Sequence, residues 1–291
     1  MDQAERIDAV SSFLLQSPPG EINDVLNDVR NIIADDALLQ EGILPSLREY
    51  NIAQFTTVDV PETNHQSIIS EAARIVAEES EERFLDPRSK TTFVFDHLTL
   101  EASKPEPYEL DTPHEEARVS LEKAALTYLA SHFLDGTVSV FAPSELQEAF
   151  TLQIVANKYN PTNFWSGRWR SEYLVNLSDK RVKGKILLNV HYYEQGNVQL
   201  ETTHNISFNI PAAAASAAPA TAASKIIALI EDEESRYQVS LNETYREMGE
   251  RTFKGLRRAL PLTRQKIDWD KVTGYKLGAE LSSSKGVFGS S

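Results

Sequence analysis

Hydrophobic residues in the first 60 positions recur at intervals of three or four, the spacing that places side chains on one face of a helix. The pattern predicts helices over residues 3–17 and 22–33, separated by a Pro-Pro-Gly turn, and a third, shorter helix that ends near Tyr50. The first helix carries its apolar face on Ile7, Val10, Phe13 and Leu14. Such stripes become buried when short helices pack on each other or on a neighbouring element.

Residues 61–112 form a connecting region whose pattern fits both strand and helix. One segment there is clearer, because an Asp-Pro turn precedes an alternating strand that contains Phe93 and Phe95. Residues 115–133 return to helical spacing and predict a helix whose apolar face includes Leu121 and Tyr128.

After Gly136 the period of the apolar positions changes from 3.6 to 2. About five alternating segments follow with short connections, which predicts an antiparallel meander, because a parallel sheet needs crossovers of a dozen or more residues. One face of the sheet alternates to polar residues. That face is expected to be either solvated or covered by another subunit.

Residues 211–224 are rich in alanine and lack bulky side chains, which favours a flexible connector. A helix over residues 225–260 is predicted next, since an apolar stripe runs from Ile226 to Ala259 in steps of three, four and seven. Such a helix is about 50 Å long. Because a lone helix is marginal in water, it should lie across a sheet face or another helix.

The predicted fold class is therefore α+β: N-terminal helices, a five-stranded antiparallel meander, a long C-terminal helix packed across the sheet, and an amphipathic C-terminal extension. We expect a single α+β domain over residues 1–266 and an extension over 267–291. The domain divides, in order, into helices (1–60), connecting region (61–112), helix and antiparallel sheet (113–210), Ala-rich connector (211–224) and long helix (225–260).

Charge and cysteine content narrow the protein class. The net charge of −14 argues against nucleic acid as the main partner, because binding to phosphates needs a basic surface. The absence of cysteine excludes disulfides, thiolate catalysis and cysteine-ligated metals, and fits a reducing compartment. The N-terminus lacks the basic and apolar regions of a secretory signal, and no apolar run reaches 18 residues. A soluble, cytosolic protein is expected.

The segment from 251 to 276 reverses the charge of the chain, with eight Lys or Arg residues against two Asp. Pro261 should end the long helix, because proline lacks an N–H group and clashes with the preceding turn. The helix dipole explains cations in the last turn but not those beyond the proline. This asymmetry predicts a basic arm that binds an acidic partner. Beyond Pro261, an apolar stripe close to one helical face is formed by Trp269, Val272, Leu277 and Leu281.

Motifs of catalysis and metal binding are absent from the sequence: no nucleotide-binding glycine loop, no G-x-S-x-G elbow and no histidine pair at metal spacing. Two histidines flank the hairpin near Gly196, and the expected pairing puts His191 opposite Leu200, so His191 and His204 are interpreted as ordinary strand residues. The acidic run at 231–234 fits a cation site or a solvated helix face, and we favour the solvated face. No cofactor, metal or enzymatic activity is predicted.

Two tryptophans and two arginines surround Gly167 in the segment NFWSGRWRSEY. Aromatic and arginine residues are enriched in interface hot spots, which fits a binding patch. The favoured alternative is structural: a strand bulged at the glycine, with both tryptophans in the core and Arg168 and Arg170 paired with acidic neighbours.

Several blocks of the sequence, in order along the chain, resemble the F-actin-capping protein α subunit. They are SPPGEINDVLNDVR (17–30), FLDPR (84–88), FDHL (95–98), NFWSGRWRSE (163–172), HYYEQGNVQL (191–200) and LRRALPLTRQKIDW (256–269). The resemblance implies an obligate heterodimer with a capping protein β subunit, in which the two sheets join into one. It further implies calcium-independent binding to the barbed end of actin filaments in the cytoplasm, where the complex blocks addition and loss of subunits without enzymatic activity.

The resemblance also implies an actin-binding role for the end of the long helix and the extension. The matching residues of this chain are Lys254, Arg257, Arg258, Arg264, Lys266, Trp269, Lys271, Val272, Leu277 and Leu281. The chain departs from the family at Tyr173, where a tryptophan is common, and at Thr273 and Gly274, which weaken the helical character of the extension. Phosphoinositides and capping regulators are further implied partners. The alternative hypothesis is an anionic-lipid or scaffold-binding module that uses the basic amphipathic tail.

Overall fold

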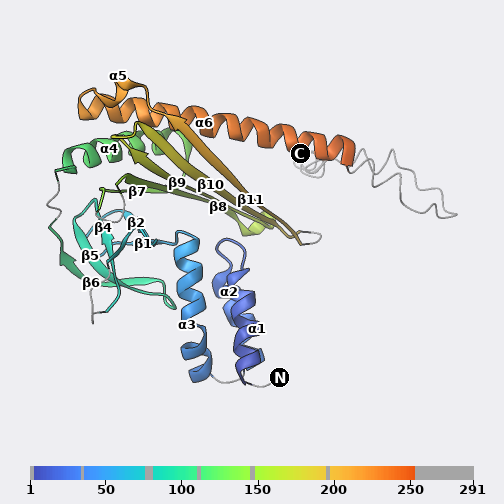
Figure 1. The fold of residues 1–291 in the computed structure, drawn as a ribbon. Coiled ribbons are helices and arrows are strands. Elements are labelled where there is room, and N and C mark those ends of the chain that lie inside the picture. The colour runs from blue at the N-terminus through green and yellow to red at the C-terminus, as the bar shows by residue number, and fades with distance from the viewer. Residues whose placement is uncertain are drawn as a thin grey trace, which may run out of the picture. The chain divides into compact units, whose positions relative to one another are not determined.

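The computed structural model describes residues 3–33, 36–75, 81–109, 113–144, 148–194 and 197–252. The chain forms two compact units, residues 1–237 and 238–291. The elements of the first unit are shown in Figure 1, and of the second unit the structure describes the end of one helix.

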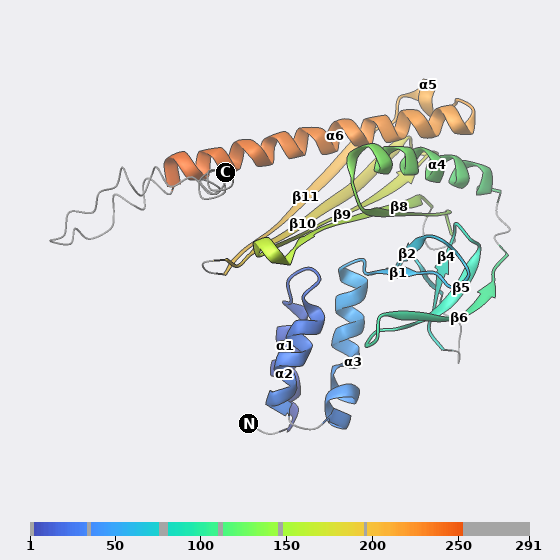
Figure 2. The same ribbon diagram turned by 180° about the vertical axis from the view of Figure 1, so that it is seen from behind.

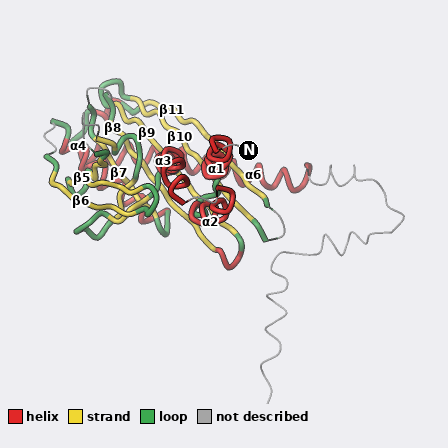
Figure 3. Tube along the Cα trace, turned by 90° about the horizontal axis from the view of Figure 1, so that it is seen from below, coloured by secondary structure: helices red, strands yellow, loops and turns green. Residues whose placement is uncertain are grey.

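Three helices form the N-terminal part: α1 (Gln3–Leu15), α2 (Ile22–Ile33) and α3 (Asp36–Ala53). They pack side by side, as the end-on view in Figure 3 shows, around a core that includes Val10, Leu14 and Leu47. Each fully buried aliphatic side chain stabilises such a core by about 1.5–3 kcal/mol. The first two predicted helices are thus confirmed. The third exists but is the longest of the three, with 18 residues, where a shorter helix ending near Tyr50 was predicted. Phe13 was wrongly placed on the buried face. Its side chain is 55% exposed.

The connecting region folds into short strands. A two-stranded sheet pairs β1 (Thr57–Asp59) with β2 (Gln66–Ile68). A four-stranded antiparallel sheet contains β3 (Arg74–Ile75), β4 (Arg83–Asp86), β5 (Thr91–Asp96) and β6 (Glu101–Pro107) in that order. The predicted strand with two phenylalanines is β5.

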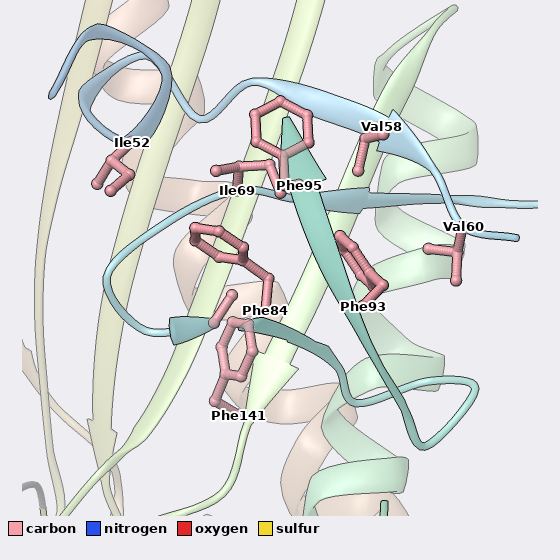
Figure 4. Close-up of a cluster of buried hydrophobic side chains, with 9 residues drawn as sticks. Ile52, Val58, Val60, Ile69, Phe84, Phe93, Phe95 and Phe141 are labelled. Carbon is pink, nitrogen blue, oxygen red and sulfur yellow. The ribbon is translucent and has the colours of Figure 1, made fainter. Parts of the chain in front are cut away.

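An aromatic core holds this region together. Phe84, Phe93 and Phe95 are buried at its centre, beside Ile52 from the end of α3 and Phe141 from the sheet described next (Figure 4). The rings of Phe84 and Phe95 meet edge to face at 6.1 Å, a favoured geometry for aromatic pairs.

The main sheet is the predicted five-stranded antiparallel meander, in the order β11-β10-β9-β8-β7. It follows α4 (Glu115–His132), which ends one residue before its predicted end. The strands are β7 (Gly136–Phe141), β8 (Phe150–Asn160), β9 (Trp165–Asn176), β10 (Arg181–Tyr192) and β11 (Val198–Asn209), with a 3₁₀ turn η1 (Pro161–Asn163) between β8 and β9.

The long helix is α6 (Pro219–Glu247), which ends in a π-helical turn, η2 (Met248–Thr252). Within the first unit, α6 and α4 cover one face of the main sheet (Figures 1 and 2). The other face contacts α3 and the loop after β2 through hydrogen bonds from Arg170 to the Ala53 carbonyl and from Ser70 to Gln153. Both faces of the sheet are therefore at least partly covered.

The prediction of a flexible, Ala-rich connector over residues 211–224 is wrong. Residues 212–215 form the short helix α5 (Ala212–Ala215), and α6 begins at Pro219 rather than at 225. Alanine has the highest intrinsic helix propensity, and its small side chain allows a close approach to the sheet. Ala214, Ala222 and Ala223 are buried in this way.

Candidate functional site

The residues predicted to bind actin begin just after the described part of the chain, which ends at Thr252. The structure therefore positions the helix that leads to them, and their role stays a prediction. Near that end, Arg251 and Glu247 form an ion pair of 2.6 Å between exposed side chains. Outside the described residues lie Lys254, Arg257, Arg258, Arg264, Lys266, Trp269, Lys271, Val272, Leu277 and Leu281.

The most distinctive feature of the described sheet is its outer strand, β11, whose 12 residues pair with β10 on one side. The structure records no strand on its other side among the described residues. An unpaired strand presents N–H and C=O groups that are ready to pair with another chain. The strand has one polar face, with Gln199, Glu201 and Thr203 exposed, and a more apolar face that turns toward α6.

Tyr237 marks the last contact of α6 with the sheet inside the first unit. Its ring stacks on His204 of β11 with the centroids 4.3 Å apart, and its hydroxyl donates a hydrogen bond to Thr202. The buried indole N–H of Trp169, whose ring lies 6.0 Å from that of Tyr237, has no partner in the described chain. Toward the β10–β11 turn the same face carries Val198, which is 61% exposed.

Glu234 holds α6 on the sheet. Its fully buried carboxylate accepts hydrogen bonds from Tyr128 of α4, from Tyr173 of β9 at 2.5 Å and from Ser171 of β9 at 3.1 Å. Burial raises the pKa of Glu234, although the three hydroxyl donors oppose this shift. Burial and the adjacent carboxylate both raise the pKa of Tyr128 and Tyr173, which keeps the two phenols protonated as donors.

The interpretation of residues 231–234 as a solvated helix face is wrong for Glu234. The other three residues of the run keep some solvent exposure, and no group of metal-ligating side chains occurs among the described residues. A sequence signal for this burial exists, since Glu234 lies four residues after Ile230 and three before Tyr237 on the apolar stripe. Because Glu234 is charged, we predicted that it is solvated despite its place on the apolar stripe.

The segment around Gly167 is mainly structural, as favoured, but it is not bulged. β9 pairs without a register shift on both sides of Gly167, with Lys158 of β8 and Val190 of β10. Trp169 is buried as predicted, whereas Trp165 is partly exposed beneath the ammonium group of Lys158.

The two arginines of this segment are buried on the opposite face of β9, and their partners are not acidic. Arg168 donates to Asn157 at 2.7 Å and to the Gln54 carbonyl at 3.2 Å. Arg170 donates to the Ala53 carbonyl and to Asn189, and burial together with Arg168 lowers the pKa of Arg170 to about 10. Carbonyl oxygens at the end of α3 thus replace the predicted carboxylates, which fixes that helix to the sheet.

The histidine pair does not form a common site. The register puts His191 opposite Gln199 rather than Leu200, because Tyr192 and Val198 are the last pair before the turn. His191 lies 2.8 Å from Glu21 in the turn between α1 and α2, on the opposite face of the sheet from His204.

These features define a class of protein: an α+β chain whose main sheet ends, among the described residues, on a strand with no outer neighbour and carries a long helix on one face. The family model for the F-actin capping protein alpha subunit matches residues 10–280 of the chain. The chain belongs to this family, whose members are structural actin-capping proteins.

Individual relatives agree over nearly the whole chain. The F-actin-capping protein subunit alpha of Emericella nidulans is 37% identical over 284 residues, covering 97% of this chain and 99% of its own. That of Caenorhabditis elegans is 36% identical over 290 residues with the same coverage. In fold, the chain is similar to the homodimeric actin capping protein alpha subunit from Plasmodium berghei, with a TM-score of 0.70 and 20% identity over 90% of this chain and 99% of the other. The family resemblance in the sequence blocks is confirmed.

Proposed function

We propose that this chain is the α subunit of a heterodimer that caps the barbed end of actin filaments independently of calcium. The observation that carries the proposal is the 12-residue edge strand β11, which has no paired strand on its outer side among the described residues, in a chain of this family. A β subunit that adds its own edge strand would continue the sheet by main-chain hydrogen bonds. The partner would also cover the exposed Val198.

Capping itself needs contact with the terminal actin subunits. The basic residues after Thr252 suit this task, because positive charges speed encounter with an acidic surface such as that of actin and orient the docking. The apolar residues of the extension would then slow dissociation. Once the terminal subunits are occupied, addition and loss of actin are blocked sterically.

The proposed location is the actin structures of the cytoplasm. Among the described residues, no helix combines the length and the apolarity that crossing a membrane requires.

The test combines purification with a functional assay. The chain is co-expressed with the β subunit of the same organism, and the complex is added to filament seeds in the presence of actin monomers. We expect a 1:1 complex that stops barbed-end elongation at a small fraction of the actin concentration, with and without a calcium chelator. Normal elongation in the presence of a stable complex would contradict capping, and failure to form the complex would contradict the heterodimer.

A further inference from the structure

A cleft of about 530 Å³ lies between the turn that joins α1 to α2 and the strands β10 and β11. One wall comes from the end of α1 and the following turn, with Phe13, Leu15 and Glu21. The other comes from β10 and β11, with His191 and Glu201. The cleft therefore opens directly beside the free edge strand.

Polar atoms gather in this cleft. Glu21 accepts hydrogen bonds from His191 Nδ1 at 2.8 Å and from Ser166 at 3.1 Å. A carboxylate can only accept, so Nδ1 carries a proton and donates it to Glu21. His191 is 94% buried, and its Nε2 has no partner. Gln54 Oε1, also in the cleft, is likewise buried without a partner.

The charge of the cleft is one-sided. Glu21 and Glu201 line it, and its described lining contains no Lys or Arg. Arg168 and Arg170 lie on the same face of the sheet, but they are buried in β9 and donate to Asn157, Asn189 and the carbonyls of Ala53 and Gln54. A ligand that supplies N–H donors and positive charge fits these acceptors, and a guanidinium group, which has donors but no acceptor, fits best.

The rim of the cleft is apolar. Phe13 and Leu15 at the end of α1 are 55% and 38% exposed, whereas Val10 and Leu14 of the same helix are buried. An exposed aromatic side chain next to an acidic cleft is typical of an interface that takes a long cationic side chain together with the apolar residues around it.

We propose that this cleft is an anchor site for the β subunit, which inserts an Arg or Lys side chain from an apolar segment while its edge strand pairs with β11. The inference rests on the proposed heterodimer and adds the chemistry of its contact. The occupant is assigned to the partner because Gln199, Leu200 and Glu201 belong both to the cleft and to the unpaired strand, so a chain that joins the edge passes over the opening.

The first arm of the test measures coverage of the cleft. The chain has no cysteine, so single-cysteine variants give an unambiguous signal in mass spectra of this chain. Phe13→Cys is compared with Val119→Cys on α4, whose parent side chain is 45% exposed and far from the cleft in sequence. In the heterodimer, we expect maleimide to modify the cysteine at position 13 at least about tenfold more slowly than the cysteine at position 119. The reason is that burial under the partner blocks access to position 13. A cleft that holds only water would leave the two rates equal.

The second arm measures the charge of the occupant. Glu201→Lys places a cation at the exposed side of the cleft, and Glu116→Lys makes the same charge change on the outside of α4. We expect Glu201→Lys to speed dissociation of the heterodimer by about tenfold or more, with a smaller effect at high salt, because a buried charge pair acts mainly on the dissociation rate.

Three results overturn the proposal. Equal labelling of the two cysteines in a heterodimer that still caps filaments would remove the cleft from the interface and leave the proposed function intact. Protection of position 13 with no effect of Glu201→Lys would show coverage by chemistry other than a cation. Absence of any heterodimer would overturn both proposals.

Discussion

Glu234 is the residue at which α6, α4 and β9 meet, and its neighbours show why the site accepts a carboxylate. Tyr173 reaches it because Gly184 stands opposite on β10: a Cβ atom at position 184 would lie 2.3 Å from the Tyr173 ring. The tyrosine at this position supplies a hydroxyl that donates to the carboxylate.

Gly184→Ala should therefore destabilise the protein by about 1–3 kcal/mol, since the ring or the strand must move to relieve the overlap. Gly167→Ala is the matched control, because it is also a strand glycine and its Cβ would meet atoms no closer than 3.9 Å. Urea unfolding of the heterodimer at fixed concentration measures both. Equal stabilities of the two variants would contradict the packing argument.

Glu234→Gln should change how stability depends on pH. The pKa of Glu234 is raised in the folded state, so above the ordinary value of 4.5 the folded chain keeps a proton that the unfolded chain has lost. Stability from this group is present below that ordinary value and falls as the pH rises through the raised pKa. The wild type should thus lose stability relative to the Gln variant as the pH rises from about 4.5 through the raised pKa of Glu234. A constant difference between the two in urea titrations at several pH values would refute this.

At the level of elements, buried alanines near the start of α6 leave no room for larger side chains. Ala223 is buried, whereas Ala220 on the same helix is exposed. Ala223→Leu should cost about 1–3 kcal/mol because the added atoms have no space. Ala220→Leu should change stability by less than about 0.5 kcal/mol. Thermal unfolding of the two heterodimers distinguishes them, and similar losses would mean that α6 does not press on the sheet at Ala223.

The elements differ in how far the sequence could predict them. The helices α1, α2 and α4 and the 12-residue strands follow from long periodic patterns, which leave few alternatives. Strands as short as β3, with two residues, offer too few positions for alternation to appear. The bonds of Arg170 to the end of α3 and the bonds of Ser171 and Tyr173 to Glu234 join segments more than 60 residues apart, which no local pattern contains.

The proposed actin contact shows the same limit. The basic run after Thr252 is visible as composition, and the family resemblance gives it a role, but neither fixes how the side chains are arranged. The cleft at Glu21 went unpredicted because Phe13 was assigned to a buried face on spacing alone. Its exposure depends on where α1 ends relative to β10 and β11.

On the scale of the whole molecule, the chain is strongly acidic, but its segment 251–276 has a net positive charge. Arg258→Glu together with Arg264→Glu should slow capping of barbed ends by about tenfold or more at low salt, because long-range attraction to actin is lost. The effect should shrink as salt rises.

The double variant Arg6→Glu with Arg30→Glu, on exposed positions of α1 and α2, changes the net charge equally and should cap at nearly the normal rate. Seeded elongation assays at two salt concentrations measure both variants. If both slow capping alike, total charge rather than the basic run governs the rate.

The uncovered edge of β11 also bears on how much of this protein a cell can keep. A 12-residue strand whose outer edge has no paired strand among the described residues is a template for aggregation, so a chain made in excess over the proposed β subunit would be a substrate for chaperones and proteases. Folding is linked by mass action to the partner that binds the folded form. The abundance of the less plentiful subunit should then set the level of both, and raising the expression of this chain alone should leave the number of capped filament ends unchanged.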